Sequence, residues 1–91
     1  MEYAAPNETQ ENRLRRLRMR SWRRGIKEMD LILGSFADTG LAALSPEDLE
    51  TYDLMLSEND QDLYAWVTGQ GEAPAHLQAM IARIARHAEK L

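Results

Sequence analysis

The sequence predicts an all-α protein, a compact bundle of five short helices. Three observations lead to this class. Apolar residues recur at spacings of three and four along most of the 91-residue chain. No stretch of useful length shows the strict alternation that is typical of a half-buried strand. Capping residues, glycines and prolines divide the chain into segments of helical length. We expect a disordered tail over residues 1–8 and a single helical domain over residues 9–91.

The first two helices are expected on either side of a glycine. Apolar residues at helical spacing predict a helix over residues 9–23, and Gly25 then interrupts the pattern. Glycine inside a helix costs about 1 kcal/mol relative to alanine, so we expect a joint between two helices there. A shared apolar face predicts the second helix over residues 26–36. Residues 37–44 are expected to form a connector with room for one helical turn.

The remaining three helices are marked by their first residues. Ser45 is a good N-cap and Pro46 suits the first helical position, so a third helix is expected from there. Asn59 or Asp60 caps a fourth helix, which stops at the glycines that follow it. Pro74 opens a fifth helix that runs to the C-terminus. The inward faces are expected to form one core: Leu17, Ile26, Met29, Leu33, Phe36, Leu49, Tyr52, Leu56, Leu63, Val67, Met80, Ile81 and Ile84.

Charge is distributed unevenly along the chain. The formal net charge is -4, but residues 13–27 contain only basic charged side chains, and residues 28–82 contain no Lys or Arg. Such a polarised molecule steers and orients a charged partner. Alternatively, the two ends neutralise each other within the fold. The sequence allows both interpretations.

The composition excludes several kinds of chemistry. The absence of cysteine excludes disulfides and thiolate metal sites. His76 and His87 lie about three helical turns apart, too far to share a metal ion, and no nucleophile–base set stands out. No apolar run reaches the roughly 20 residues of a membrane span. Residues 1–10 contain acidic and no basic side chains, so we expect neither a secretory signal nor a transit peptide, and hence a cytoplasmic bacterial protein.

The most distinctive stretch lies around Gly25. Arg24 and Glu28 are four residues apart and lie together if the helix continues through them. Gly25 offers either a positive φ or a bare surface that another backbone can approach. Alternatively, Glu28 closes a capping box at the start of its own helix, and Arg24–Glu28 is an ordinary surface pair worth about 0.3 kcal/mol. The residues alone leave these alternatives open.

A family resemblance favours a functional role for this stretch. Residues 24–28 match the Arg-Gly-x-x-Glu motif of the SdhE family of succinate dehydrogenase assembly factors. Residues 60–66 are similar to the Asp-x-Asp-Leu-aromatic-x-Trp segment of the same family. The resemblance covers residues 14–84, and no motif position departs from the pattern.

The resemblance implies what this protein does. It implies a non-enzymatic factor that binds the flavoprotein subunit of succinate dehydrogenase and promotes covalent attachment of FAD to that subunit. In some bacteria the family also serves the related fumarate reductase. The flavin belongs to the client, so no catalytic residue, cofactor or metal is expected in this chain. We also expect no nucleic-acid partner, no membrane insertion, and a monomer when the protein is free. The residues assigned to partner binding are Arg20, Arg23, Arg24, Gly25, Glu28, Asp30, Asp62 and Trp66.

Two other functions compete with this assignment. The arginine-rich first helix suggests nucleic-acid binding, although the negative net charge opposes it. An antitoxin-like helical adaptor is the second alternative. Asp62 and Trp66 are assigned to a second contact patch, although Trp66 also suits the core.

Overall fold

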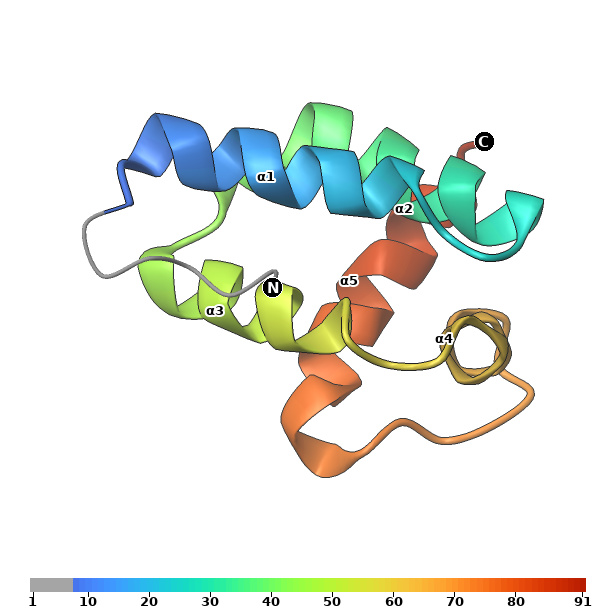
Figure 1. Ribbon diagram of the computed structural model, residues 1–91. Coiled ribbons are helices and arrows are strands. Elements are labelled where there is room, and N and C mark those ends of the chain that lie inside the picture. Colours follow the sequence, from blue (N-terminus) through green and yellow to red (C-terminus); the bar gives the residue numbers. More distant parts are fainter. Residues whose placement is uncertain (1–7) are drawn as a thin grey trace.

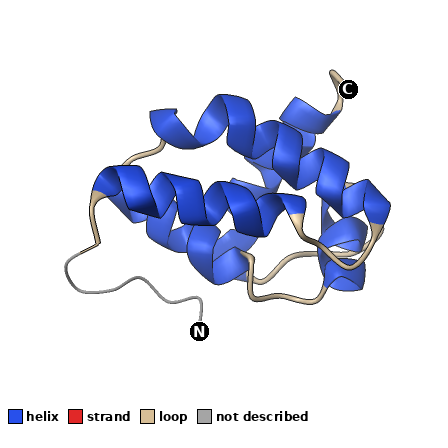
Figure 2. Ribbon diagram, turned by 45° about the horizontal axis from the view of Figure 1, so that its top comes forward, coloured by secondary structure: helices blue, strands red, loops and turns tan. Residues whose placement is uncertain are grey.

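The computed structural model describes residues 8–91, and these residues form helices joined by short loops (Figures 1 and 2). No strand occurs among them, which confirms the expected all-α class. Residues 1–7, most of the expected tail, lie outside the described part of the chain. The elements are α1 (Gln10–Trp22), α2 (Lys27–Gly40), the 3-10 turn η1 (Leu41–Ala43), α3 (Pro46–Met55), α4 (Asp60–Val67), the 3-10 turn η2 (Ala75–Leu77) and α5 (Gln78–Ala88).

Helix α2 is at the centre of the packing, in contact with α1, α4 and α5. In Figure 1, α1 runs across the top of the molecule with α3 below it, and α4 is seen end-on at the right. All the helices contribute to one core, in which Leu17, Leu33 and Tyr52 are completely buried. Of the expected core residues, only Ile26 and Val67 are partly rather than fully buried, and both pack against the core.

The end of α2 differs from the expected connector. The helix continues to Gly40 and leads directly into η1, so the expected end at Phe36 is wrong. Ala37 and Leu41 are buried one and two turns after Leu33, and they extend its apolar face. Burial of these side chains outweighs the helix cost of a terminal glycine. At the other end of the chain, η2 precedes α5, so the last α-helix begins after Leu77.

A glycine within α2 allows α1 to pack closely on it. A Cβ atom at Gly34 would lie 2.2 Å from the ring of Trp22, so only glycine permits the ring to rest on the helix there. The Trp22 indole Nε1 donates a hydrogen bond to Asp38, over 3.2 Å. Trp22 is therefore fixed in place although it is exposed on one side. This contact fixes how α1 packs against α2.

Candidate partner-binding site

The motif stretch lies in a loop, and the helix does not continue through it. Helix α1 ends at Trp22 and α2 begins at Lys27, so Arg24 and Gly25 are in the connection. Glu28 is exposed in the first turn of α2. Among the described residues, the Glu28 side chain has no hydrogen bond or ion pair, either with Arg24 or with the start of its own helix. Its carboxylate is therefore available to a partner.

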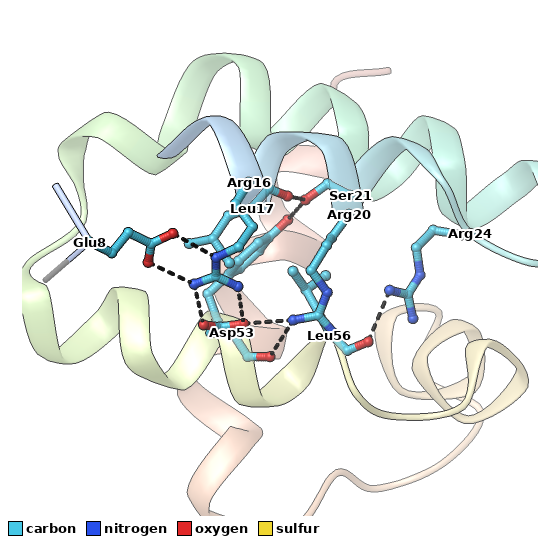
Figure 3. A network of polar contacts seen from close by, with 9 residues as sticks. Glu8, Arg16, Leu17, Arg20, Ser21, Arg24, Asp53 and Leu56 are labelled. Atoms are coloured by element: carbon cyan, nitrogen blue, oxygen red, sulfur yellow. Dashed lines mark hydrogen bonds and ion pairs between the residues drawn. The ribbon is translucent and has the colours of Figure 1, made fainter. Parts of the chain in front are cut away.

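The Arg24 side chain fastens this loop to the loop between α3 and α4. Its Nε lies 2.8 Å from Oδ1 of Asp60 and donates to it. Its Nη1 donates to the carbonyl oxygen of Leu56, as Figure 3 shows, and its Nη2 donates to that of Glu58, over 2.9 and 3.2 Å. Only 9% of the Arg24 side chain is exposed. All three nitrogens are thus used inside the protein, in the planar geometry that suits arginine.

The backbone of the loop is held by two carboxylates. Oδ2 of Asp60 accepts the backbone N–H of Gly25, and Oδ1 of Asp30 accepts that of Arg24, over 2.6 Å. A Cβ atom at Gly25 would lie 2.9 Å from Oδ2 of Asp60, closer than van der Waals contact allows. Among the described residues, the one positive φ belongs to Gly69. Gly25 is therefore required by the close approach of Asp60 and not by a left-handed backbone.

A second polar cluster joins α1 to α3 (Figure 3). Arg16 donates to both oxygens of Asp53, over 3.2 and 2.8 Å, and to both oxygens of Glu8, over 2.9 and 3.3 Å. Arg20 donates to Oδ1 of Asp53, over 2.6 Å. The hydrogen bonds to Asp53 and then to Glu8 raise the pKa of the Arg16 guanidinium above its usual value. One carboxylate of α3 thus binds two successive turns of α1.

Beneath this cluster, two buried hydroxyls connect the same helices. The hydroxyl oxygens of Ser21 and Tyr52 lie 2.7 Å apart and share a hydrogen bond. Ser21 also donates to the carbonyl oxygen of Leu17, over 2.8 Å. Burial raises the pKa of Tyr52 to about 12, although the hydrogen bond with Ser21 and the nearby charges of Arg24 and Arg20 act in the opposite direction. This pair stabilises the position of α1 on α3 and is not available to a ligand.

The expected site residues therefore divide into groups. Arg24 and Gly25 meet at the α1–α2 loop through Asp60, and Asp30 accepts the backbone N–H of Arg24 there. Arg20 lies one turn before the loop and is bound to Asp53. Arg23, Gly25 and Glu28 are exposed around this loop. Asp62 and Trp66 are on α4: Asp62 is exposed, whereas Trp66 is half-buried and packs against the core. Trp66 thus has a structural role, whatever else it contacts.

Asp60 is the residue that the sequence interpretation did not place in the site. The N-cap of α4 is Asn59, whose side chain accepts the backbone N–H of Gln61, over 2.7 Å. Asp60 is the first residue of the helix, and its carboxylate points to Arg24 and Gly25 instead. Two consecutive capping residues were the available signal, because a helix needs only one of them as its N-cap.

Two further features, a metal-binding cluster and a membrane-spanning helix, are absent from the described residues. No cluster of three or more His, Asp or Glu side chains that suits a metal ion occurs between residues 8 and 91. Within the same range, no helix has the length and apolar character needed to cross a membrane.

Comparison with known proteins identifies the family. The family model described as flavinator of succinate dehydrogenase matches residues 15–88, most of the chain. The chain belongs to this family. Three relatives are each named succinate dehydrogenase assembly factor 2, mitochondrial. The one from Aspergillus terreus is 51% identical over 58% of this chain and 18% of its own length. The one from Dictyostelium discoideum is 32% identical over 80% of this chain and 52% of its own length. The one from Candida glabrata is 44% identical over 68% of this chain and 40% of its own length.

These comparisons confirm the resemblance to the assembly factors and correct the expected compartment. The flavinator match includes the whole of the α1–α2 loop and α4. The expectation of a cytoplasmic bacterial protein is wrong, because these relatives are named mitochondrial and come from eukaryotes. This chain spans only 18–52% of their lengths. The charges of residues 1–10 are consequently no guide to the compartment.

Proposed function

We propose that this protein binds the flavoprotein subunit of succinate dehydrogenase and promotes covalent attachment of FAD to it. The flavinator family match over residues 15–88 is the observation that carries the proposal. The fumarate reductase flavoprotein is proposed as a second client. The reacting histidine and the flavin both belong to the client. The protein therefore acts as a monomeric assembly factor and not as an enzyme, with no cofactor or metal of its own.

The α1–α2 loop is the proposed docking surface, and its residues have different roles. Gly25 and Glu28 are exposed and face the client, with Arg23 beside them. Because Gly25 lacks a side chain, the client backbone approaches closely there. Arg24 and Asp30 are positioning residues, since their polar groups hold the loop in shape. Arg20, Asp62 and Trp66 complete the proposed contact surface on α1 and α4.

The proposed mechanism is selection of one client conformation. A factor that binds one arrangement of the client better than the others raises the population of that arrangement. If that arrangement brings the client histidine to the flavin, the reaction benefits from proximity, without any reacting group from this protein. A rigid docking loop suits this role, because little conformational entropy is lost when it binds. The network around Asp60 supplies that rigidity.

The test measures covalent flavin directly. The apo flavoprotein subunit is incubated with FAD, with or without this protein, and flavin fluorescence is read in a denaturing gel. We expect fluorescence to rise with the wild-type protein and to stay at the background level with Gly25→Arg. The matched control is Ala82→Arg, which introduces the same side chain at an exposed position of α5, outside the residues of the proposed docking surface.

Two results would contradict the proposal at different levels. The flavoprotein subunit is rejected as the client if fluorescence does not rise with the wild-type protein and no complex forms on a sizing column. A rise that is lost in Gly25→Arg only because this variant is unfolded by circular dichroism rejects Gly25 as a docking residue. An equal loss in Ala82→Arg also rejects the assignment to this loop.

A further inference from the structure

A groove of about 430 Å³ runs along the outer face of α1. Its lining residues recur at spacings of three and four, so they form one stripe along the helix that continues into the start of the α1–α2 loop. The opposite face of α1 is buried through Leu17 and Ser21. The groove is lined by Asn12, Arg15, Arg16, Met19, Arg20, Arg23 and Arg24.

The inner wall of the groove is a row of arginines that are already bound. Arg16, Arg20 and Arg24 follow one another at a spacing of four residues. Their guanidinium groups reach across to Asp53 on α3 and to Asp60 at the start of α4. These carboxylates hold the row rigid and compensate much of its charge.

The outer wall has a different character. Arg15, Met19 and Arg23 also follow one another at a spacing of four. Both arginines are exposed, and neither side chain has a hydrogen bond or ion pair with any part of the chain that the structure describes. Met19, between them, is 47% exposed. The outer wall therefore presents two available cations separated by one apolar side chain.

The protein itself shows how a carboxylate binds at this surface. Glu8 precedes α1 and binds the N-terminal end of the inner wall through both of its oxygens, to Nε and Nη2 of Arg16. This two-point contact is the geometry in which arginine recognises carboxylates most strongly. The unbound arginines of the outer wall offer the same chemistry.

We propose that this groove binds an extended acidic segment of a partner protein, with the pattern acid–x–apolar–x–acid. Four residues of an α-helix rise about 6 Å, and two residues of an extended chain rise about 6.6 Å. Side chains at positions one, three and five of an extended segment point to the same side. They therefore match Arg15, Met19 and Arg23 in order. A partner helix with the same three side chains at a spacing of four also rises about 6 Å between them, so a helical peptide is included in the test.

Nucleic acid fits this surface less well. Glu8, Asp53 and Asp60 already bind the arginines of the inner wall, so few of its cations are left for a continuous row of phosphates. Met19 interrupts the outer row of cations at its centre. An acidic segment with an apolar residue in its middle satisfies both features.

The groove shares Arg20, Arg23 and Arg24 with the docking surface proposed for the client. This proposal still goes beyond flavinylation, because its test needs no flavoprotein. Binding of three labelled peptides to the full chain is measured by fluorescence anisotropy at low salt. The matched peptide contains Glu-Thr-Leu-Thr-Glu between glycine–serine flanks. The shifted peptide, Glu-Glu-Thr-Leu-Thr, has the same composition with adjacent acids. The neutral peptide, Gln-Thr-Leu-Thr-Gln, has the same spacing without charge.

We expect the matched peptide to bind at least about tenfold more tightly than the other two, because only it engages both arginines. Arg15→Gln and Arg23→Gln should each weaken binding by about three- to fivefold, as expected for partly exposed ion pairs. The matched control is Arg86→Gln, an equal loss of charge at an exposed position of α5, which should leave binding unchanged. Because Arg15 and Arg23 have no internal partners, their variants should melt at the wild-type temperature.

Several outcomes overturn the proposal. Equal binding of the matched and shifted peptides shows general charge attraction and no register. If Arg86→Gln weakens peptide binding as much as Arg15→Gln and Arg23→Gln do, the attraction is again general. Tighter binding of a helical alanine-based peptide with Glu, Leu and Glu at a spacing of four excludes the extended conformation. A single-stranded oligonucleotide that binds more tightly than the matched peptide, or inorganic phosphate that displaces the peptide at millimolar concentration, assigns the groove to another anion.

Discussion

Two loops of this protein contain glycine, and they are held in different ways. The α1–α2 loop is fastened by side chains from elsewhere, chiefly Asp60, which binds both Arg24 and Gly25. In the loop after α4, residues 68–74, the turn at residues 69–71 is held by backbone hydrogen bonds from its N–H groups to carbonyl oxygens at the end of α4. The first glycine is required by a contact, whereas Gly69 is required by a backbone φ of 82°. Glycine is thus needed at these two positions for different physical reasons.

This difference predicts how each loop responds to mutation. Damage to the first loop spreads to the α3–α4 connection, because Arg24 links the two. Damage to the second loop stays local, because no side chain from outside α4 holds the N–H groups of residues 69–71. Variants in the first loop should therefore affect stability and docking together. Variants in the second loop should affect stability alone.

The largest expected effect is that of Asp60→Ala. The substitution leaves the guanidinium of Arg24, only 9% exposed on its side chain, without its carboxylate, and it leaves the N–H of Gly25 without its acceptor. Removing one partner of a largely buried pair costs about 2–4 kcal/mol. Urea unfolding followed by circular dichroism measures this loss, and covalent flavin formation should fall with it.

The matched control for this prediction is Asp62→Ala. Asp62 is exposed on the same helix, and among the described residues it has no hydrogen bond or ion pair. Its removal should change the free energy of unfolding by no more than about 0.5 kcal/mol. Equal destabilisation by the two alanine variants would show that the contacts of Asp60 contribute little.

The second prediction concerns pH and the buried contact between α1 and α3. Burial raises the pKa of Tyr52 to about 12, so the folded protein binds this proton more strongly than the unfolded chain does. The resulting stability is complete below the unfolded pKa of about 10 and is lost as the pH rises to about 12. The loss amounts to roughly 2–3 kcal/mol. Urea unfolding at a series of alkaline pH values measures it.

Tyr52→Phe isolates this effect. The variant lacks the titrating hydroxyl and should unfold with a shallower pH dependence above about pH 10. It should also be less stable at neutral pH by about 1 kcal/mol, because the buried hydrogen bond between Ser21 and Tyr52 is lost. An unchanged alkaline slope in Tyr52→Phe would assign the pH dependence to other groups.

The third prediction tests the second loop. Gly69→Ala places a side chain at a φ of 82°, where nothing lies within 4 Å to clash with it. The cost is therefore conformational, about 1 kcal/mol, and comes from the left-handed backbone. Covalent flavin formation should remain at the wild-type level, because this loop takes no part in the proposed docking. A loss of flavin attachment in a folded Gly69→Ala variant would show that the second loop also contacts the client.

Much of the fold was predictable because helical spacing and caps are local signals. Ser45 caps α3, as expected, by accepting the N–H of Asp48 over 3.1 Å. The end of α2 was not predictable, because the burial of Ala37 and Leu41 depends on which helices pack against them. The role of Gly34 was hidden for a similar reason, since its partner Trp22 lies on another helix. Tertiary packing overrides local propensity at such positions.

The candidate site was predictable as a stretch of sequence but not as a geometry. The motif pointed to Arg24 and Gly25, which the structure brings together through Asp60, and one of its open interpretations was an Arg24–Glu28 pair within one helix. The actual partner of Arg24 is Asp60, thirty-six residues away in the chain. A single sequence contains no signal for such a distant contact between two loops. The groove on α1 was visible only as a stripe of arginines, since the division into bound and available side chains requires α3.

The smallest expected effect has the opposite sign to that of Gly69→Ala. Gly71 does not have a positive φ, and a Cβ atom there would meet Trp66 and Ala65 at 3.6–4.0 Å, in ordinary van der Waals contact. Alanine should therefore fit without strain and reduce the conformational entropy of the unfolded chain, which stabilises the protein by about 0.5 kcal/mol. Paired urea unfolding of Gly69→Ala and Gly71→Ala measures both signs in one loop. If both variants lose stability equally, the loop has no spare room beside Trp66, and side-chain packing as well as backbone conformation holds it.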